Sequence, residues 1–191
     1  MPLKRVGKPK QERAPGRGQA RTVVVSGLSA AGPRGVVRLG VLNLPCALGR
    51  RGRRARKREG DGATPVGSWL TVRVLYRADR IRRPMTSLPV KPIGRDDGWC
   101  DAPADRNYNR PVRLAYAASA EALWRTDRLY DIVVVLSHNT RPRVRGAGSA
   151  IFLHVAKSGY APTEGCIALR REHLLALLRN LTTGAVIRVL P

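Results

Sequence analysis

The chain has 191 residues, with 36 lysines and arginines against 13 aspartates and glutamates, and therefore a formal net charge of +23 at pH 7. Its hydrophobic fraction of 43% excludes wholesale disorder, and the lack of any apolar run of about 18 residues excludes a transmembrane helix. The charge favours an anionic partner, whether nucleic acid, a membrane surface or a carboxylate-rich polymer.

The N-terminal segment 1–21 is rich in Lys, Arg, Pro and Gly and predicts a basic flexible tail, so the folded domain is expected over 22–191. The segment lacks the apolar stretch of about 7–15 residues that a signal peptide needs, and no export signal is recognisable. Order is expected to begin with the β-branched strand TVVV at 22–25. Short strands separated by turn residues are expected over 35–48.

A basic run, RRGRRARKR, follows at 50–58 and holds seven Lys or Arg residues. It reads either as a solvated hairpin loop or as an electrostatic attachment to an anionic polymer, because arginine binds carboxylates bidentately. The alternating segment LTVRVLY at 70–76 predicts a strand. Five prolines within 81–113 argue against a helix there and indicate a long ordered excursion over the domain surface.

The C-terminal half predicts a short helix at 119–125, with Ser119 as its N-cap, and then mainly strands. Leucines at helical spacing predict a second helix at 170–181. Strands are expected at 130–136, 149–155 and 185–190. Seven or eight short strands with little helix indicate a mostly β sandwich or barrel.

The segment 148–171 suggests a catalytic site. In it a strand ends at His154, and Cys166 follows twelve positions later. This separation allows a strand, a loop and a return that bring imidazole to thiol, and a neighbouring base activates a cysteine nucleophile. Gly165 allows a tight turn whose N–H groups could face an oxyanion. The alternative is a buried cysteine and a core histidine. Ser149 has no base placed to activate it.

The three cysteines, Cys46, Cys100 and Cys166, cannot form a complete disulfide framework, and their spacings match no zinc motif. Two of them could pair, or Cys46 and Cys100 could be small buried apolar residues. No metal site is predicted.

The element TEGCIAL, with His154 on the strand before it, resembles the signature of the YkuD-type L,D-transpeptidases. The segment GDGATPVGSW at 60–69 is similar to that family's TPxG element, and SAIFLH is similar to the strand that carries its histidine. The resemblance covers about residues 22–190. It implies a mostly β fold, a β-sandwich of mixed sheets with one or two packed helices, in which 81–113 is a Pro-rich insertion into a catalytic domain spanning 22–191.

The resemblance also implies a reaction. Cys166 would attack a carbonyl of a peptidoglycan stem peptide, typically after the third residue, diaminopimelate, and form a thioester that an amine of a second stem resolves. His154 would activate the thiol and shuttle the proton, and the backbone around Thr163, Glu164 and Gly165 would stabilise the oxyanion. Neither metal nor organic cofactor is implied. The expected partners are stem peptides and glycan strands, and the protein is expected to act as a monomer in the periplasm or cell wall.

Departures from the family pattern are informative. Glu164 replaces the second histidine of the commonest motif, and a carboxylate there disfavours thiolate unless it points away or pairs with an arginine. Ala168 stands where the family commonly has a substrate-handling arginine, for which Arg170 or Arg171 could substitute. These features resemble a compact proteobacterial branch, in which some members join the first residue of one stem to the third of another and carry a Pro-rich segment. Other divergent members hydrolyse stems instead.

The Pro-rich segment supplies further candidates for substrate binding: Tyr108, Asn109, Arg110 and Trp99, with Asp101 in the same stretch. Trp99 could stack on a sugar or serve as a half-buried anchor, and the other three could line a groove or form a plain surface loop. His138 follows a buried strand and could lie near the site or simply occupy a turn. A nucleic-acid-binding protein remains the alternative of another class, although the chain has only three Trp, five Tyr and one Phe and no basic motif interleaved with aromatics.

Overall fold

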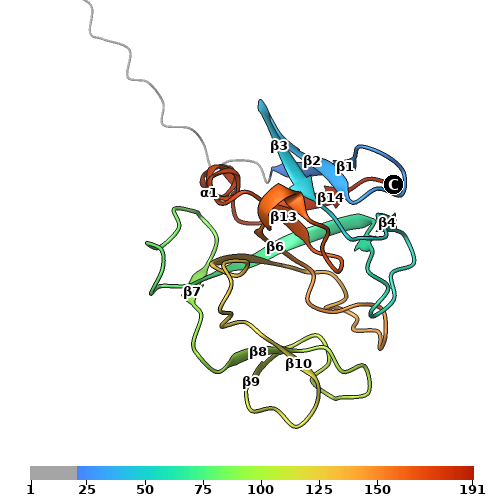
Figure 1. The fold of residues 1–191 in the computed structure, drawn as a ribbon, viewed down its shortest axis with the longest axis vertical. Coiled ribbons are helices and arrows are strands. Elements are labelled where there is room, and N and C mark those ends of the chain that lie inside the picture. The colour runs from blue at the N-terminus through green and yellow to red at the C-terminus, as the bar shows by residue number, and fades with distance from the viewer. Residues whose placement is uncertain (1–20) are drawn as a thin grey trace, which may run out of the picture.

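The computed structural model describes residues 21–191 and shows a mostly β protein built on one large sheet (Figure 1). The tail predicted over 1–21 therefore lies, apart from Arg21, outside the described residues. The sheet has nine strands in the order β11-β12-β13-β3-β2-β1-β14-β6-β7. Their bounds are β1 (Thr22–Gly27), β2 (Arg34–Leu39), β3 (Leu42–Ala47), β6 (Gly67–Tyr76), β7 (Val90–Pro92), β11 (Ile132–Leu136), β12 (Phe152–Val155), β13 (Ile167–Leu169) and β14 (Val186–Val189).

The sheet closes into a barrel, because β11 pairs with β6 as well as with β12. The sandwich of separate sheets implied by the resemblance is wrong in this respect, although the mostly β class is confirmed. The reason is the length of β6, whose ten residues pair with β14 through Gly67–Leu70 and with β11 further along. One long strand thus joins the two ends of the sheet.

The barrel interior is filled by alternate residues of the strands, as the period of two in a β-strand requires. Val23 and Val25 of β1 are fully buried, as is Ile187 of β14, which pairs with β1 in parallel. The α-helix α1 (Arg171–Asn180) packs Leu174, Leu177 and Leu178 against this core. The helix predicted at 170–181 is therefore confirmed, and the strands predicted at 22–25, 35–48, 70–76, 130–136, 149–155 and 185–190 are each found with small shifts of their ends.

A smaller lobe, made mostly from the Pro-rich segment, lies beside the barrel (Figure 1, lower part). It is a three-stranded antiparallel sheet of β10 (Ala120–Ala122), β8 (Asp97–Cys100) and β9 (Pro111–Arg113). The short helix predicted at 119–125 is wrong. These residues pair with β8, with Glu121 opposite Trp99, and this tertiary pairing overrides the local helical preference. A further parallel pair, β4 (Arg53–Arg54) and β5 (Thr64–Pro65), lies within and after the basic run.

Aromatic packing fixes the lobe on the barrel. The ring of Trp99 meets that of Phe152 edge-on with centroids 5.2 Å apart, and Tyr130 meets the same ring at 6.1 Å. Such T-shaped contacts are favourable beyond the apolar area that they bury. The lobe is therefore held against the strand that carries His154. The 3-10 turn η1 (Ser158–Tyr160) connects β12 to the segment before Cys166.

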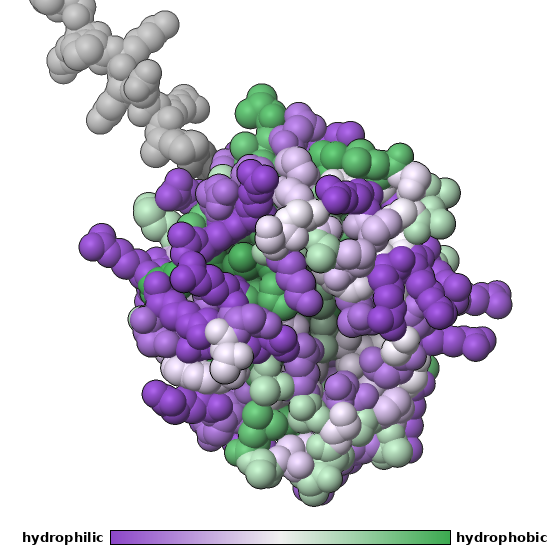
Figure 2. All heavy atoms as spheres, in the orientation of Figure 1, coloured by the Kyte–Doolittle hydropathy of each residue, from purple (hydrophilic) through white to green (hydrophobic). Residues whose placement is uncertain are grey.

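Hydrophilic side chains cover both flanks of the face seen in Figure 2, as the excess of arginine leads one to expect. In residues 21–191 no helix has the length and apolar character needed to cross a membrane.

Candidate active site

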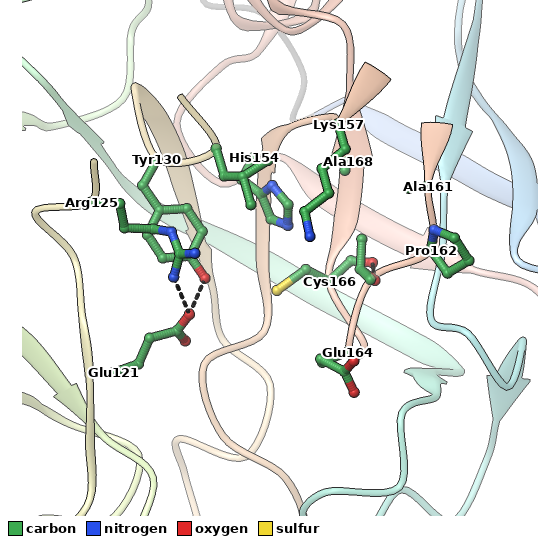
Figure 3. Close-up of a pocket in the computed structure, with 12 residues that line it drawn as sticks. Glu121, Arg125, Tyr130, His154, Lys157, Ala161, Pro162, Glu164, Cys166 and Ala168 are labelled. Carbon is green, nitrogen blue, oxygen red and sulfur yellow. Dashed lines mark hydrogen bonds and ion pairs between the residues drawn. The ribbon is translucent and has the colours of Figure 1, made fainter. Parts of the chain in front are cut away.

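His154 lies on β12, and Cys166 immediately precedes the neighbouring parallel strand β13. His154 on β12 is in register with Ala168 on β13, and Cys166 precedes Ala168 by two residues. Because side chains two residues apart along a strand point to the same side, the imidazole and the thiol face one space. Figure 3 shows both side chains in that space. The structure thus brings together the two residues that the sequence analysis singled out.

The His154 ring is 6% exposed, and its Nδ1–H donates a hydrogen bond to the Val155 carbonyl at 2.8 Å. Since a carbonyl can only accept, this bond places the proton on Nδ1 and leaves Nε2 as an acceptor. Burial lowers the pKa of His154 to about 4, so the ring is neutral at pH 7. The Tyr130 ring packs edge-on against it at 5.4 Å.

The Cys166 sulfur is held by two backbone groups of the segment before β12. Its thiol donates to the Ala150 carbonyl at 3.2 Å, and it accepts from the Phe152 N–H at 3.4 Å. Burial, and then the nearby Glu121 carboxylate, raise the pKa of Cys166 to about 12. No hydrogen bond joins the sulfur to His154 in this resting arrangement. The pair is therefore a neutral thiol beside a neutral imidazole, which points to proton transfer during the attack.

The turn before Cys166 is fixed by threonines. The Thr163 hydroxyl donates to the Cys166 carbonyl at 2.7 Å and accepts from the Gly165 N–H at 3.2 Å. Thr64, from the segment that resembles TPxG, donates to the same carbonyl at 3.4 Å. Gly165 adopts φ of 137°, a conformation open chiefly to glycine. Thr163 and Gly165, predicted around an oxyanion site, thus set the backbone path into the nucleophile.

Glu164 points away from the sulfur and forms an ion pair with Arg50 at 2.8 Å, with 72% of its side chain exposed. Glu164 is not among the groups that shift the pKa of Cys166. The basic run therefore contributes to the site as well as to the surface. Its Lys57 is buried and paired with Asp61.

Two cavities meet at Cys166. The smaller, of about 180 Å³, contains His154 and two cations, Arg125 and Lys157 (Figure 3). The larger, of about 440 Å³, extends along the basic run and the lobe. Cys166, Glu121 and Glu164 line both of them. A group attached to the sulfur would thus be reachable from two sides.

The substrate-binding candidates lie elsewhere. Tyr108, Asn109, Trp99 and His138 are all buried and are not among the residues lining these two cavities. His138 packs edge-on against Trp69 at 4.7 Å. Arg110 is exposed outside both cavities, and the Arg170 guanidinium lies over the Tyr160 ring at 5.6 Å. Asp101, from the same Pro-rich stretch, does line the larger cavity.

Asn109 fastens the lobe to the loops before β12. Its side-chain oxygen accepts from Trp99 Nε1 at 3.0 Å and from the Ala150 N–H at 3.2 Å, and its amide donates to the carbonyls of His138 and Asn139. We expect Asn109→Ala to lower the free energy of unfolding by about 2–4 kcal/mol, because four buried or half-buried groups lose their partner. Chemical denaturation measures this. Arg110→Ala, its exposed neighbour, should change stability by less than about 0.5 kcal/mol, and equal losses in the two variants would contradict the assignment.

Four side chains around the pair were not singled out by the sequence: Glu121, Arg125, Tyr130 and Lys157. Tyr130 donates to Glu121 at 2.6 Å, and Arg125 lies 3.8 Å from the same carboxylate. Glu121 lies in the segment 119–125, which the sequence predicts to be a helix. Nothing in that pattern indicates that the segment forms a strand beside β8. Arg125 and Lys157 place positive charge in the smaller cavity beside His154, whereas Lys57 is the cation whose charge lowers the pKa of Cys166 against the effect of burial.

Cys46 and Cys100 are buried free thiols, which settles the question of their pairing. Within residues 21–191 no group of three or more His, Cys, Asp or Glu side chains is arranged to hold a metal ion.

Solved structures with a similar chain path are L,D-transpeptidases. One is L,D-transpeptidase 1 of Mycobacterium tuberculosis, at 15% identity over 91% of this chain and 63% of that one, with a TM-score of 0.43. Another is the L,D-transpeptidase of Mycobacterium smegmatis, at 15% identity over 90% and 59%, with a TM-score of 0.43. This chain thus spans less than two thirds of those structures. No curated protein is detectably similar in sequence.

The family comparison covers most of the chain. The model of the L,D-transpeptidase catalytic domain, YkuD, matches residues 34–189, which include the lobe, the barrel apart from β1, and both residues of the thiol–imidazole pair. The chain therefore belongs to the YkuD family of L,D-transpeptidase catalytic domains.

Proposed function

We propose that this protein is a cysteine L,D-transpeptidase that crosslinks peptidoglycan stem peptides. The observation that carries the proposal is the placement of Cys166 and His154 on one face of adjacent strands, at the point where two cavities meet. A transferase needs room for a donor and an acceptor at one sulfur, whereas a hydrolase needs room for one stem and water. The paired cavities favour transfer over hydrolysis.

In the first half-reaction His154 Nε2 accepts the thiol proton as the Cys166 sulfur attacks a donor carbonyl. The tetrahedral intermediate collapses to a thioester, and the departing amine takes the proton from His154. In the second half-reaction an acceptor amine attacks the thioester carbon, the C–S bond breaks and the thiol is restored. We assign the donor to the smaller cavity, because Arg125 and Lys157 suit the carboxylates of a stem peptide.

The Pro-rich lobe is consistent with a link between the first residue of one stem and the third of another, which we keep as part of the proposal. Such chemistry requires an extracytoplasmic location at the cell wall. The remaining arginines suit attachment to a polymer rich in carboxylates.

The test is mass spectrometry of purified protein incubated with muropeptides. Wild-type protein should give new dimers, and Cys166→Ala should give none, because the nucleophile is lost. Cys46→Ala removes a buried sulfur on β3 and should retain activity. Released stem fragments without dimers would indicate a hydrolase instead. If Cys166→Ala left every product unchanged while both proteins bound nucleic acid with a steep salt dependence, the binding-protein alternative would stand.

A further inference from the structure

The larger cavity is acidic in a strongly basic protein. Four of the 13 acidic residues of the chain line it, although the formal net charge is +23. They are Glu59, Asp101, Glu121 and Glu164. Only two cations, Arg50 and Lys57, share the lining. The local excess of carboxylates is therefore opposite in sign to the protein as a whole, and it marks a place for a cationic group.

Both cations are already engaged. Arg50 pairs with Glu164 at the rim, and Lys57 pairs with Asp61, which does not line the cavity. Among the described residues, Glu59 and Asp101 form no ion pair with a lysine or arginine. Glu121 has Arg125 at 3.8 Å, but that side chain lines the smaller cavity. Two of the four carboxylates of the larger cavity, Glu59 and Asp101, are thus left without a cation partner in the described part of the protein.

Two polar atoms in the lining lack partners. The Oδ1 of Asp101 is buried without a hydrogen-bond partner, and so is the Oγ of Ser149, next to the Tyr108 phenol. Ser149 is only 7% exposed. A buried acceptor without a donor is costly, so unpartnered groups beside a cavity point to a ligand that donates hydrogen bonds. An ammonium carries three such donors and a positive charge.

We infer that the larger cavity binds the primary ammonium of the acceptor stem through Asp101, Ser149 and Glu121. This inference rests on the proposed function and deepens it, since it gives the second cavity a substrate of stated chemistry. Glu121 and Cys166 both line the two cavities. An amine held beside Glu121 therefore lies next to a thioester on Cys166. The carboxylates raise the local concentration of the acceptor over that of water, which favours transfer over hydrolysis.

Transfer of the acyl group to the bound amine begins with the loss of a proton. The bound ammonium releases one proton to solvent and becomes a neutral amine. Its nitrogen attacks the thioester carbon, a C–N bond forms and the C–S bond breaks. His154 takes the second proton from nitrogen and delivers it to the Cys166 sulfur. The products are one amide, one thiol and one released proton, and no oxidant or cofactor is needed.

The experiment compares Asp101→Asn with Glu172→Gln, a substitution of equal charge change on the exposed start of α1. A donor muropeptide is mixed with a tripeptide stem that carries a free diaminopimelate amine. Acyl-enzyme formation and the ratio of dimer to hydrolysed donor are measured by mass spectrometry. Asp101→Asn should lower that ratio at least tenfold and leave acyl-enzyme formation within about twofold, whereas Glu172→Gln should match wild type. Equal ratios in both variants would overturn the inference.

A second experiment, a binding titration, tests this inference independently of the proposed function. Cys166→Ala, which cannot be acylated, is titrated with the same tripeptide and with its N-acetylated form. Tighter binding of the free amine, lost on adding Asp101→Asn or Ser149→Ala, supports the ammonium site even if no crosslinking is ever detected. Equal affinity for the two peptides refutes it even if wild-type protein forms dimers. Thermal unfolding checks each variant, and Ser149→Ala serves in place of Asp101→Asn if the latter does not fold.

Discussion

Replacing His154 by asparagine is expected to lower kcat/KM for crosslinking by about 10²–10⁴-fold. Asparagine can keep the bond to the Val155 carbonyl, because its side-chain N–H lies where Nδ1–H does in the histidine. It cannot take a proton from the thiol, since an amide nitrogen is not a base. The loss therefore reports proton transfer rather than packing. Steady-state crosslinking rates measure it, and circular dichroism shows that the barrel is retained.

The same pair predicts the pH dependence of alkylation at Cys166. The thiol has its pKa raised to about 12 by burial, and His154 has its pKa lowered to about 4. The thiolate, which is the species that reacts, is thus scarce at pH 7 and rises with pH. The alkylation rate should climb about tenfold per pH unit between pH 7 and 9, with little change in His154→Asn. A plateau across this range would instead reveal a preformed thiolate–imidazolium pair and contradict the neutral resting state.

Gly165→Ala should cost about 10²–10³-fold in kcat/KM and about 1–3 kcal/mol in the free energy of unfolding. An added Cβ would lie 2.8 Å from the Ala63 carbonyl oxygen, at a φ of 137° that side chains rarely adopt. Ala63 is part of the backbone before β5, so it cannot move aside as a flexible side chain would. The turn must shift, and with it the sulfur and the nearby amides. Crosslinking rates and chemical denaturation measure the two losses.

Gly159→Ala is the matched control for this turn. Gly159 also has a positive φ, of 66°, but an added Cβ there meets nothing within 4 Å. It should cost only the backbone strain of about 1 kcal/mol and leave activity within a few-fold of wild type. If the two variants lost activity equally, the close approach of Gly165 to Ala63 would have no bearing on the reaction.

The sequence predicts correctly those helices and strands whose own pattern of apolar residues determines their structure. The leucines of α1 repeat at helical spacing, and the apolar run of β11 is a strand buried on both sides, so both were found. The spacing of His154 and Cys166 suits a strand and its return, and the resemblance of TEGCIAL to a family signature singled the pair out from a buried cysteine and a core histidine. The strand pattern left a sandwich or a barrel open, because closure depends on β6 reaching two partners and nothing in the local pattern of β6 encodes a second partner.

The candidate site was predicted only as far as Cys166 and His154. Glu121 and Arg125 lie on a segment whose composition favours a helix, and they reach the site only because that segment pairs with β8. For Asn109 the polar, proline-rich segment indicates a groove or a surface loop, and for Trp99 it leaves open a sugar contact or a half-buried anchor, yet both side chains are buried at the junction of the lobe and the barrel. Long-range contacts decided these positions, and a single sequence does not display them.

The residues of the candidate site come from two parts of the molecule, the barrel and the three-stranded lobe. Cys166, His154 and Thr163 belong to the barrel and the loop that returns to it, whereas Asp101 and Glu121 belong to the three-stranded lobe. Under the proposed function, changes within the lobe should alter the choice of acceptor and leave Cys166 and His154 in place. Exchanging this lobe between two members of the family should then change which acceptor is used, because the barrel holds the Cys166–His154 pair and the lobe holds the acceptor.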